Sequence, residues 1–267
     1  MYYWTNLSIQ FANQRNYLDE LFKIYPISPN LRRYIDDSVW IGIENAFNAQ
    51  NNEELIRKLL SLELFPIKDS YVAYLKRDNT SISRNPQTIN RIAGTLYALG
   101  IDKVYEKCTE PKETNRQMGP LFKAWIDKGT IGVPVYKTPV SFLNSQGNAI
   151  LNASDTEMQN FAKTYLGYQR DKGLDFIGRF NDKYVIGEAK FLTDFGGHQD
   201  AQFDDAISTV ISPLVIPNRL KAEVVPIAIL DGVLYIVGNN KMHKYLKKHD
   251  DVRILSSLLL REFLYQA

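Results

Sequence analysis

The stretch KGLDFIGRFNDKYVIGEAKFLTDFGGHQ, residues 172–199, decides the fold of this chain. Two runs rich in β-branched and aromatic residues flank Asn181-Asp182, and a polar pair between such runs is typical of a two-residue hairpin turn. With this turn Phe180 faces Lys183, and the pairing of all other residues follows from it. The stretch therefore predicts a β-hairpin with a defined register.

This register places three charged side chains on one face. Asp175 lies directly across from Glu188, and Lys190 lies diagonal to Asp175, within roughly 7–8 Å. Like charges directly opposite each other destabilise a sheet, and two partly shielded carboxylates either share a proton or bind a cation. Mg²⁺ takes one or two carboxylates and completes its shell with water and phosphate. Metal, water and a lysine together suit phosphodiester hydrolysis.

The alternative is an ordinary surface ion pair between Asp175 and Lys190, because exposed hairpin faces commonly carry such charges and each pair stabilises little. Two features favour a functional site. The charges lie in the apolar segments LDFIG and YVIGEAKFL, and a Gly-Gly loop and a polar helix start follow them.

These residues resemble the PD-(D/E)XK nuclease superfamily, whose pattern is an acid on one strand and acid-any-lysine on the next. The match consists of Asp175 in GLDFIG and Glu188-Ala189-Lys190 in GEAK. Leu174 stands where the family usually has proline. The resemblance implies an α/β protein with a restriction-endonuclease-like mixed central sheet flanked by helices.

The resemblance also implies roles for individual residues. Asp175 and Glu188 would bind Mg²⁺ together with the carbonyl of Ala189, and Lys190 would orient or activate the attacking water. The family's core helix often supplies a further acid, for which Glu157 is the candidate here. A solvated glutamate favoured by the helix dipole is the alternative for Glu157.

The order of elements around the hairpin fits this family over residues 154–238. A helix is expected over 154–167, another over 198–212, and two β-rich runs around the turn signal Asp231-Gly232. Residues 1–150 form a mainly helical region, expected to embrace DNA and to serve recognition or dimerisation, and residues 151–267 form the nuclease core. Glu44, on a helix of the first region, is a weaker candidate for the additional acid.

Polar side chains that suit base edges or phosphates lie in three segments of the chain. One follows the acid-any-lysine strand, one precedes an apolar helix, and one belongs to a loop. The expected DNA-binding residues are His198, Gln199, Gln202, Asn115, Arg116, Gln117 and Arg84. The alternatives are an ordinary polar helix start capped by Thr114 for residues 112–120 and a solvated loop for residues 77–87.

Type II restriction endonucleases are the part of the superfamily that fits best, because the chain is of single-domain size and has no P-loop or other motor motif. We expect a double-stranded DNA substrate and a homodimer matching a palindromic site. The first alternative is a repair or junction nuclease of the same fold. The second is a non-enzymatic DNA-binding regulator with a helix-turn-helix over 85–129, which leaves the charged hairpin without a purpose.

Composition is compatible with these expectations but does not single them out. The 267 residues carry a net charge of +2, and the single cysteine excludes an intrachain disulfide. No stretch approaches the length of a membrane span, and the first residues lack the pattern of a signal peptide. We therefore expect a protein of the prokaryotic cytoplasm without membrane contact.

Overall fold

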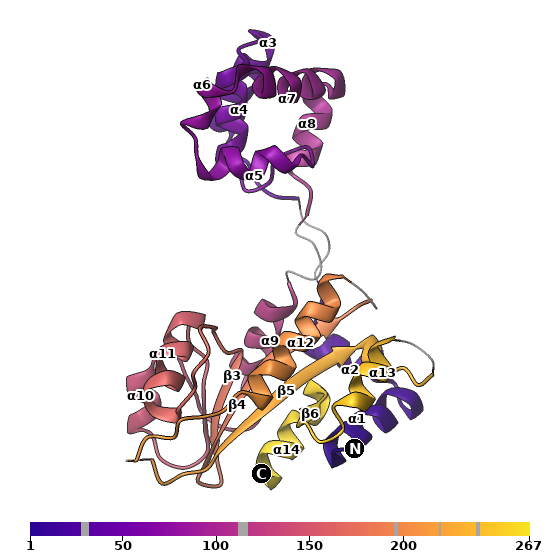
Figure 1. Cartoon of the computed structure of the whole chain (residues 1–267), viewed down its shortest axis with the longest axis vertical. Helices are drawn as coiled ribbons and strands as arrows, with labels where there is room; N and C mark the ends of the chain where they lie inside the picture. The colour runs from indigo at the N-terminus through magenta and orange to yellow at the C-terminus, as the bar shows by residue number, and fades with distance from the viewer. Residues whose placement is uncertain (28–31, 112–116, 195–196, 219, 239–240) are drawn as a thin grey trace. The chain divides into compact units, whose positions relative to one another are not determined.

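The computed structural model describes the whole chain except residues 28–31, 112–116, 195–196, 219 and 239–240 (Figure 1). The chain divides into two compact units. The sheet unit comprises Met1–Ile27 and Thr114–Ala267, and the helical unit comprises Ser28–Glu113. The predicted division lies at residue 150, whereas residues 1–27 and 114–150 belong to the same compact unit as residues 151–267.

The sheet unit contains a mixed sheet, as predicted, and this sheet has six strands. Its strands follow one another in chain order across the sheet. Neighbouring strands are parallel in the pairs β1–β2, β4–β5 and β5–β6 and antiparallel in the pairs β2–β3 and β3–β4. The strands are β1 (Val135–Tyr136), β2 (Ala149–Leu151), β3 (Phe176–Phe180), β4 (Lys183–Leu192), β5 (Val224–Gly232) and β6 (Ile254–Leu255).

The β3–β4 hairpin has the predicted turn and register. Phe180 pairs with Lys183, and Ile177 pairs with Ile186. Asn181 and Asp182 both have positive φ angles, 49° and 61°. Two successive positive φ angles define the type I′ turn, whose twist matches that of the flanking strands. Asn and Asp tolerate this conformation better than most residues, and the turn could therefore be predicted from the sequence.

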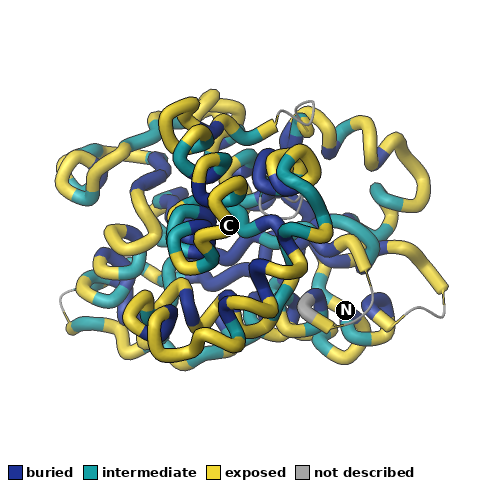
Figure 2. The backbone as a smooth tube through the Cα atoms, turned by 90° about the horizontal axis from the view of Figure 1, so that it is seen from above, coloured by how far each residue is buried: buried dark blue, intermediate teal, exposed yellow. Residues whose placement is uncertain are grey.

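Helices cover the sheet, and two clusters of buried apolar side chains join them to it. One cluster joins α10 and α11 to β2, β3 and β4, and the larger one joins the terminal helices and α12 to β3–β6. Figure 1 shows α12 lying over β4 and β5, and Figure 2 shows dark blue, buried backbone in the interior of the molecule. The helices are α1 (Tyr3–Gln14), α2 (Tyr17–Ile24), α9 (Met118–Asp127), α10 (Pro139–Asn144), α11 (Asp155–Leu166), α12 (His198–Ile211), α13 (Lys241–Lys248) and α14 (Leu260–Gln266).

The expected second hairpin around Asp231-Gly232 is wrong. Residues Val224–Gly232 form the single strand β5, and a 3-10 helix, Val233–Tyr235, follows it. Asp231 is fully buried and accepts hydrogen bonds from the hydroxyls of Ser256 and Ser257, which lie far along the chain. These tertiary contacts override the local turn preference of Asp-Gly. The next strand along the chain is β6, which pairs with β5 in parallel.

The helical unit confirms the expectation that the first half of the chain is mainly helical. Its buried apolar cluster draws side chains from all of its helices. Gly100, with a φ of 83°, separates the last two of them. The helices are α3 (Asp37–Asn48), α4 (Asn52–Ser61), α5 (Ser70–Arg77), α6 (Ser81–Arg84), α7 (Pro86–Leu99) and α8 (Ile101–Cys108).

Candidate active site

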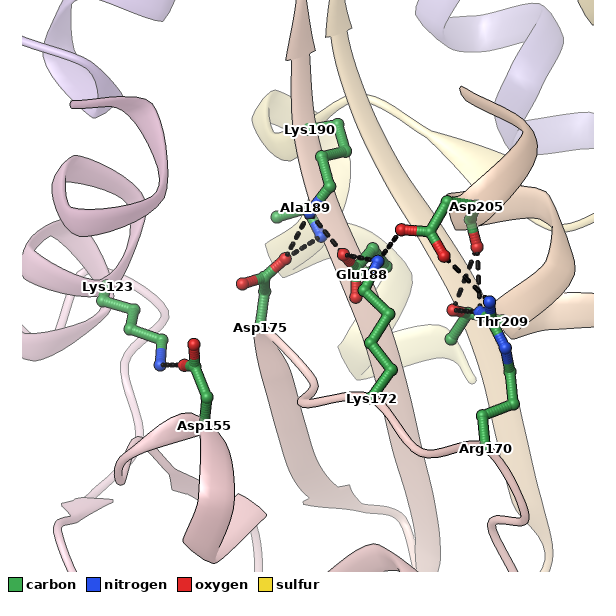
Figure 3. Close-up of polar contacts among 10 residues, drawn as sticks. All are labelled: Lys123, Asp155, Arg170, Lys172, Asp175, Glu188, Ala189, Lys190, Asp205 and Thr209. Atoms are coloured by element: carbon green, nitrogen blue, oxygen red, sulfur yellow. Dashed lines mark hydrogen bonds and ion pairs between the residues drawn. The ribbon is translucent and has the colours of Figure 1, made fainter. Parts of the chain in front are cut away.

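Asp175 and Glu188 face each other at the end of the β3–β4 hairpin (Figure 3). Asp175 directly precedes β3, and its backbone N–H donates to the carbonyl of Gly187 at 3.0 Å. The register pairs Phe176 with Gly187, and its continuation by one residue sets Asp175 opposite Glu188. Glu188 lies on β4 between β3 and β5 and is only 1% exposed. The hairpin therefore brings two carboxylates together in a largely buried place.

Lys190 contacts both carboxylates, as its diagonal position predicts. Its Nζ lies 3.2 Å from Asp175 Oδ2 and forms an ion pair with Glu188 Oε1. The backbone N–H of Ala189 donates to the same Asp175 Oδ2 at 2.9 Å. One oxygen of each acid is therefore held by donors of β4. The structure thus brings together the three residues of the predicted motif.

A polar network on the other side of Glu188 was not anticipated from the sequence. Lys172 Nζ lies 2.7 Å from Glu188 Oε1 and also forms an ion pair with Asp205 of α12. Arg170 binds Asp205 Oδ1 at 2.8 Å, and its second nitrogen donates to Thr209 Oγ1 at 2.5 Å. Two basic residues just before the hairpin were the available signal, but their partner on α12 depends on the crossover between β4 and β5.

The two lysines differ in their electrostatic surroundings. Burial lowers the pKa of Lys190, but the charges of Asp175 and Glu188 outweigh burial and leave this pKa above its ordinary value. Burial likewise lowers the pKa of Lys172, and here the contact with Glu188 does not make up for it, so the pKa stays below its ordinary value. Lys190 is therefore the more firmly protonated of the two.

The carboxylates fit a divalent cation. Glu188 Oε2 is buried and has no hydrogen-bond partner among the residues that the structure describes. In Figure 3 the second oxygen of Asp175 points away from the donors of β4. A buried carboxylate oxygen without a partner is unfavourable, and a metal ion would satisfy it. Two carboxylates match the ligand preference of Mg²⁺, which completes its shell with water and phosphate.

The carboxylate set is small. Within the described parts of the chain, no three or more histidine, cysteine, aspartate or glutamate side chains are grouped so that they could hold a metal ion. A site with Asp175 and Glu188 as its only acids would leave most of the metal shell to water and substrate, which is common for Mg²⁺.

The two further acids considered in the sequence have other partners. Glu157 forms a capping box at the start of α11, where its Oε2 accepts from the hydroxyl of Ser154 at 2.6 Å. This hydrogen bond lowers the pKa of Glu157. Glu44 belongs to the helical unit and accepts from the indole N–H of Trp40 at 2.8 Å. A metal-binding role of Glu157 or Glu44 stays a prediction.

Several of the predicted DNA-binding residues fall outside the described part of the structure. These are Asn115, Arg116 and the side chain of His198. Gln117, which directly precedes α9, is half-buried. Their role in base recognition stays a prediction.

The other three predicted DNA-binding residues have different surroundings. Gln199 is buried, and its Oε1 accepts from the backbone N–H of Thr193 at 3.2 Å. Gln202 is half-buried on α12. Arg84 is exposed in the helical unit and pairs with Asp78 at 2.7 Å. In this conformation Arg84 is the most accessible of the three, while Gln199 supports the chain locally.

The single cysteine of the chain is buried. Burial raises the pKa of Cys108 to about 12, so its thiol does not serve as a nucleophile at neutral pH. None of the helices in the described segments has the length and apolar character that a bilayer span requires.

Comparison with protein-family models finds a match over nearly the whole chain. The model of a family described as Tsp45I type II restriction enzyme matches residues 2–267. This range covers nearly the whole chain, including both units, and agrees with the resemblance found in the hairpin. Neither the curated proteins nor the solved structures contain a match.

Proposed function

Because the chain belongs to the Tsp45I family of type II restriction enzymes, we propose that it cuts double-stranded DNA at a specific sequence in a Mg²⁺-dependent reaction. Hydrolysis leaves 5′-phosphate and 3′-hydroxyl ends. The observation that carries the metal dependence is the buried, unpartnered Oε2 of Glu188 beside Asp175, among the residues that the structure describes. A restriction enzyme meets incoming DNA inside a prokaryotic cell, so we place its action in the cytoplasm.

In this proposal Asp175 and Glu188 hold the metal, and the carbonyl of Ala189 completes the protein ligands. Bound Mg²⁺ supplies a Lewis acid for the phosphodiester. The ammonium group of Lys190 lies against both carboxylates, where it donates to the attacking water or to a phosphate oxygen. Water attacks phosphorus in line and gives up a proton to solvent, the bond from phosphorus to the 3′ oxygen breaks, and that oxygen takes up a proton from solvent.

Recognition is proposed to come from the polar segments named above and from the helical unit. A homodimer would present two such surfaces related by a two-fold axis, which suits a palindromic DNA site. Gel filtration with and without a cleaved oligonucleotide duplex tests this arrangement.

The decisive experiment is digestion of a long, unmethylated viral DNA with Mg²⁺ or with EDTA. The test variant is Lys190→Ala, and the matched control is Lys183→Ala, which removes a lysine of the same strand that pairs with Glu223 at the surface. We expect discrete, Mg²⁺-dependent fragments from the natural protein and the control, and none from Lys190→Ala.

The other outcomes distinguish the alternatives. A smear of fragments would indicate a non-specific or structure-directed nuclease. Intact DNA that is bound equally well with and without Mg²⁺ would indicate a binding protein and refute the proposed function. Full cleavage by Lys190→Ala would refute the role assigned to this lysine.

A further inference from the structure

Glu188 carries two ammonium groups on one oxygen. Lys190 reaches Oε1 from its own strand, and Lys172 reaches the same Oε1 from the segment before β3, at 2.7 Å. The nuclease motif accounts for Lys190 only. The side chain of Lys172 is 29% exposed, so its contact with Glu188 is partly shielded from water.

Lys172 is held in this place by a second acid. Its Nζ pairs with Asp205, and Arg170 binds the same carboxylate at 2.8 Å and the carbonyl of Asp205 at 3.0 Å (Figure 3). Arg170 is further fixed by its hydrogen bond to Thr209. These contacts connect α12 to β4 through charged groups. They hold the ammonium group of Lys172 between Glu188 and Asp205.

The whole cluster is electrically balanced without a metal ion. Its acids are Asp175, Glu188 and Asp205, and its bases are Lys172, Lys190 and Arg170, three of each. A balanced cluster attracts a divalent cation less than two free carboxylates would. Lys172 lies between the carboxylates of Glu188 and Asp205. Without Lys172, these two carboxylates would attract a second cation to this place.

We propose that Lys172 is a positioning residue that acts as a fixed counter-ion of Glu188. It binds Oε1 of Glu188 and leaves Oε2 available to a metal ion, and its positive charge limits the affinity of the site for divalent metal. The inference rests on the proposed function, because it requires a metal ion between Asp175 and Glu188. Asp205 acts on the metal through Lys172. A second divalent ion is excluded from the place between Glu188 and Asp205 as long as Lys172 lies there.

The test is a titration of the DNA-free protein with Mn²⁺, followed by electron paramagnetic resonance of the free ion. Lys172→Met removes one positive charge at nearly constant side-chain length. We expect Mn²⁺ to bind about tenfold more tightly, because one unit charge a few ångströms from a divalent ion repels it by about this much in a water-like dielectric. The stoichiometry is expected to rise from one ion to two. Lys172→Arg should restore the natural affinity.

Asp205→Asn provides a change of opposite sign. It removes a negative charge and leaves Lys172 with Glu188 alone, so Mn²⁺ should bind several-fold more weakly. Lys163→Met is the control, because Lys163 pairs with the exposed Asp171 outside the cluster, and its affinity should equal that of the natural protein. General damage to the fold would weaken binding in both cluster variants and would not produce opposite signs.

The results separate this inference from the proposed function. If the natural protein binds no Mn²⁺, or if Glu188→Gln binds it equally well, the metal site itself is refuted. If Glu188→Gln loses binding but Lys172→Met binds Mn²⁺ no tighter than the natural protein, the counter-ion role is overturned. Weaker DNA binding by Lys172→Met with unchanged Mn²⁺ affinity would instead make Lys172 a phosphate ligand.

Discussion

Replacement of Glu188 by glutamine tests the metal site without DNA. The side chain of Glu188 is 2% exposed, and its Oε1 is bound by Lys172 and Lys190. A glutamine side chain in its place would keep the shape and one acceptor oxygen but would remove the negative charge and the carboxylate oxygen that faces the proposed metal. Two effects are expected, one on stability without metal and one on the response to Mg²⁺.

The magnitude without metal follows from the contacts that remain. Removal of one partner of a buried ion pair typically costs about 3–5 kcal/mol when the other charge is left alone. Here Lys190 keeps Asp175 at 3.2 Å, and Lys172 keeps Asp205. We therefore expect Glu188→Gln to lower the free energy of unfolding by only about 1–2 kcal/mol, because both lysines retain a partner.

The response to Mg²⁺ is the sharper quantity. At a Mg²⁺ concentration about tenfold above the dissociation constant, a ligand that binds only the folded state adds about 1.4 kcal/mol to the free energy of unfolding. The natural protein should show this increase in urea unfolding followed by circular dichroism, relative to EDTA. Glu188→Gln should show none.

Glu157→Gln is the matched control. Glutamine also completes a capping box, so the helix start at Ser154 is preserved and the Mg²⁺ response should stay intact. An unchanged Mg²⁺ response in Glu188→Gln would refute the proposed metal site. A lost response in Glu157→Gln would instead assign the additional acid of the family to Glu157.

Two further predictions concern stability. Asp231 accepts hydrogen bonds from the hydroxyls of Ser256 and Ser257, so Asp231→Asn should lower the free energy of unfolding by about 2–4 kcal/mol. The control Asp171→Asn, at an exposed position, should lower it by less than about 0.5 kcal/mol. Burial raises the pKa of Asp231, so the contribution of this titration to the free energy of unfolding is full below the ordinary aspartate pKa and is lost as the pH rises through the raised value. Urea unfolding at several pH values should show this pH dependence in the natural protein and not in Asp231→Asn. Asp182→Gly should raise stability by up to about 1 kcal/mol in the same assay, because glycine adopts the φ of 61° without strain; a loss of stability would show that the Asp182 side chain matters more than its backbone.

The hairpin was predictable because its information is local. The turn at Asn181-Asp182 fixes the register, and the alternation of the strands then places Asp175, Glu188 and Lys190 on one face. The mixed sheet and the flanking helices were implied by the family resemblance that this segment carries. The start of α11 was equally readable, since Ser154 caps it as expected.

Features that depend on distant segments were not predictable. Asp-Gly at 231–232 reads as a turn, but the serines that bind Asp231 belong to the C-terminal segment, and only the folded chain brings them together. Helical periodicity likewise could not predict that α1 and α2 belong to the sheet unit, because it identifies a helix but not the element against which the helix packs. The contact between Lys172 and Asp205 depends on how α12 returns over β4.

The hydrogen bonds of the two acids explain how the hairpin accommodates its charges. Asp175 Oδ2 accepts from the N–H of Ala189 and pairs with Lys190, and Glu188 Oε1 pairs with Lys190 and Lys172. Each acid is thus oriented through one oxygen, while the buried Oε2 of Glu188 has no partner among the described residues. Groups that are already oriented need little rearrangement when a ligand arrives, which is how preorganised sites stabilise charge in a reaction. In the proposed site a cation would bind at the open oxygens of these acids, and the two lysines would set how strongly it binds.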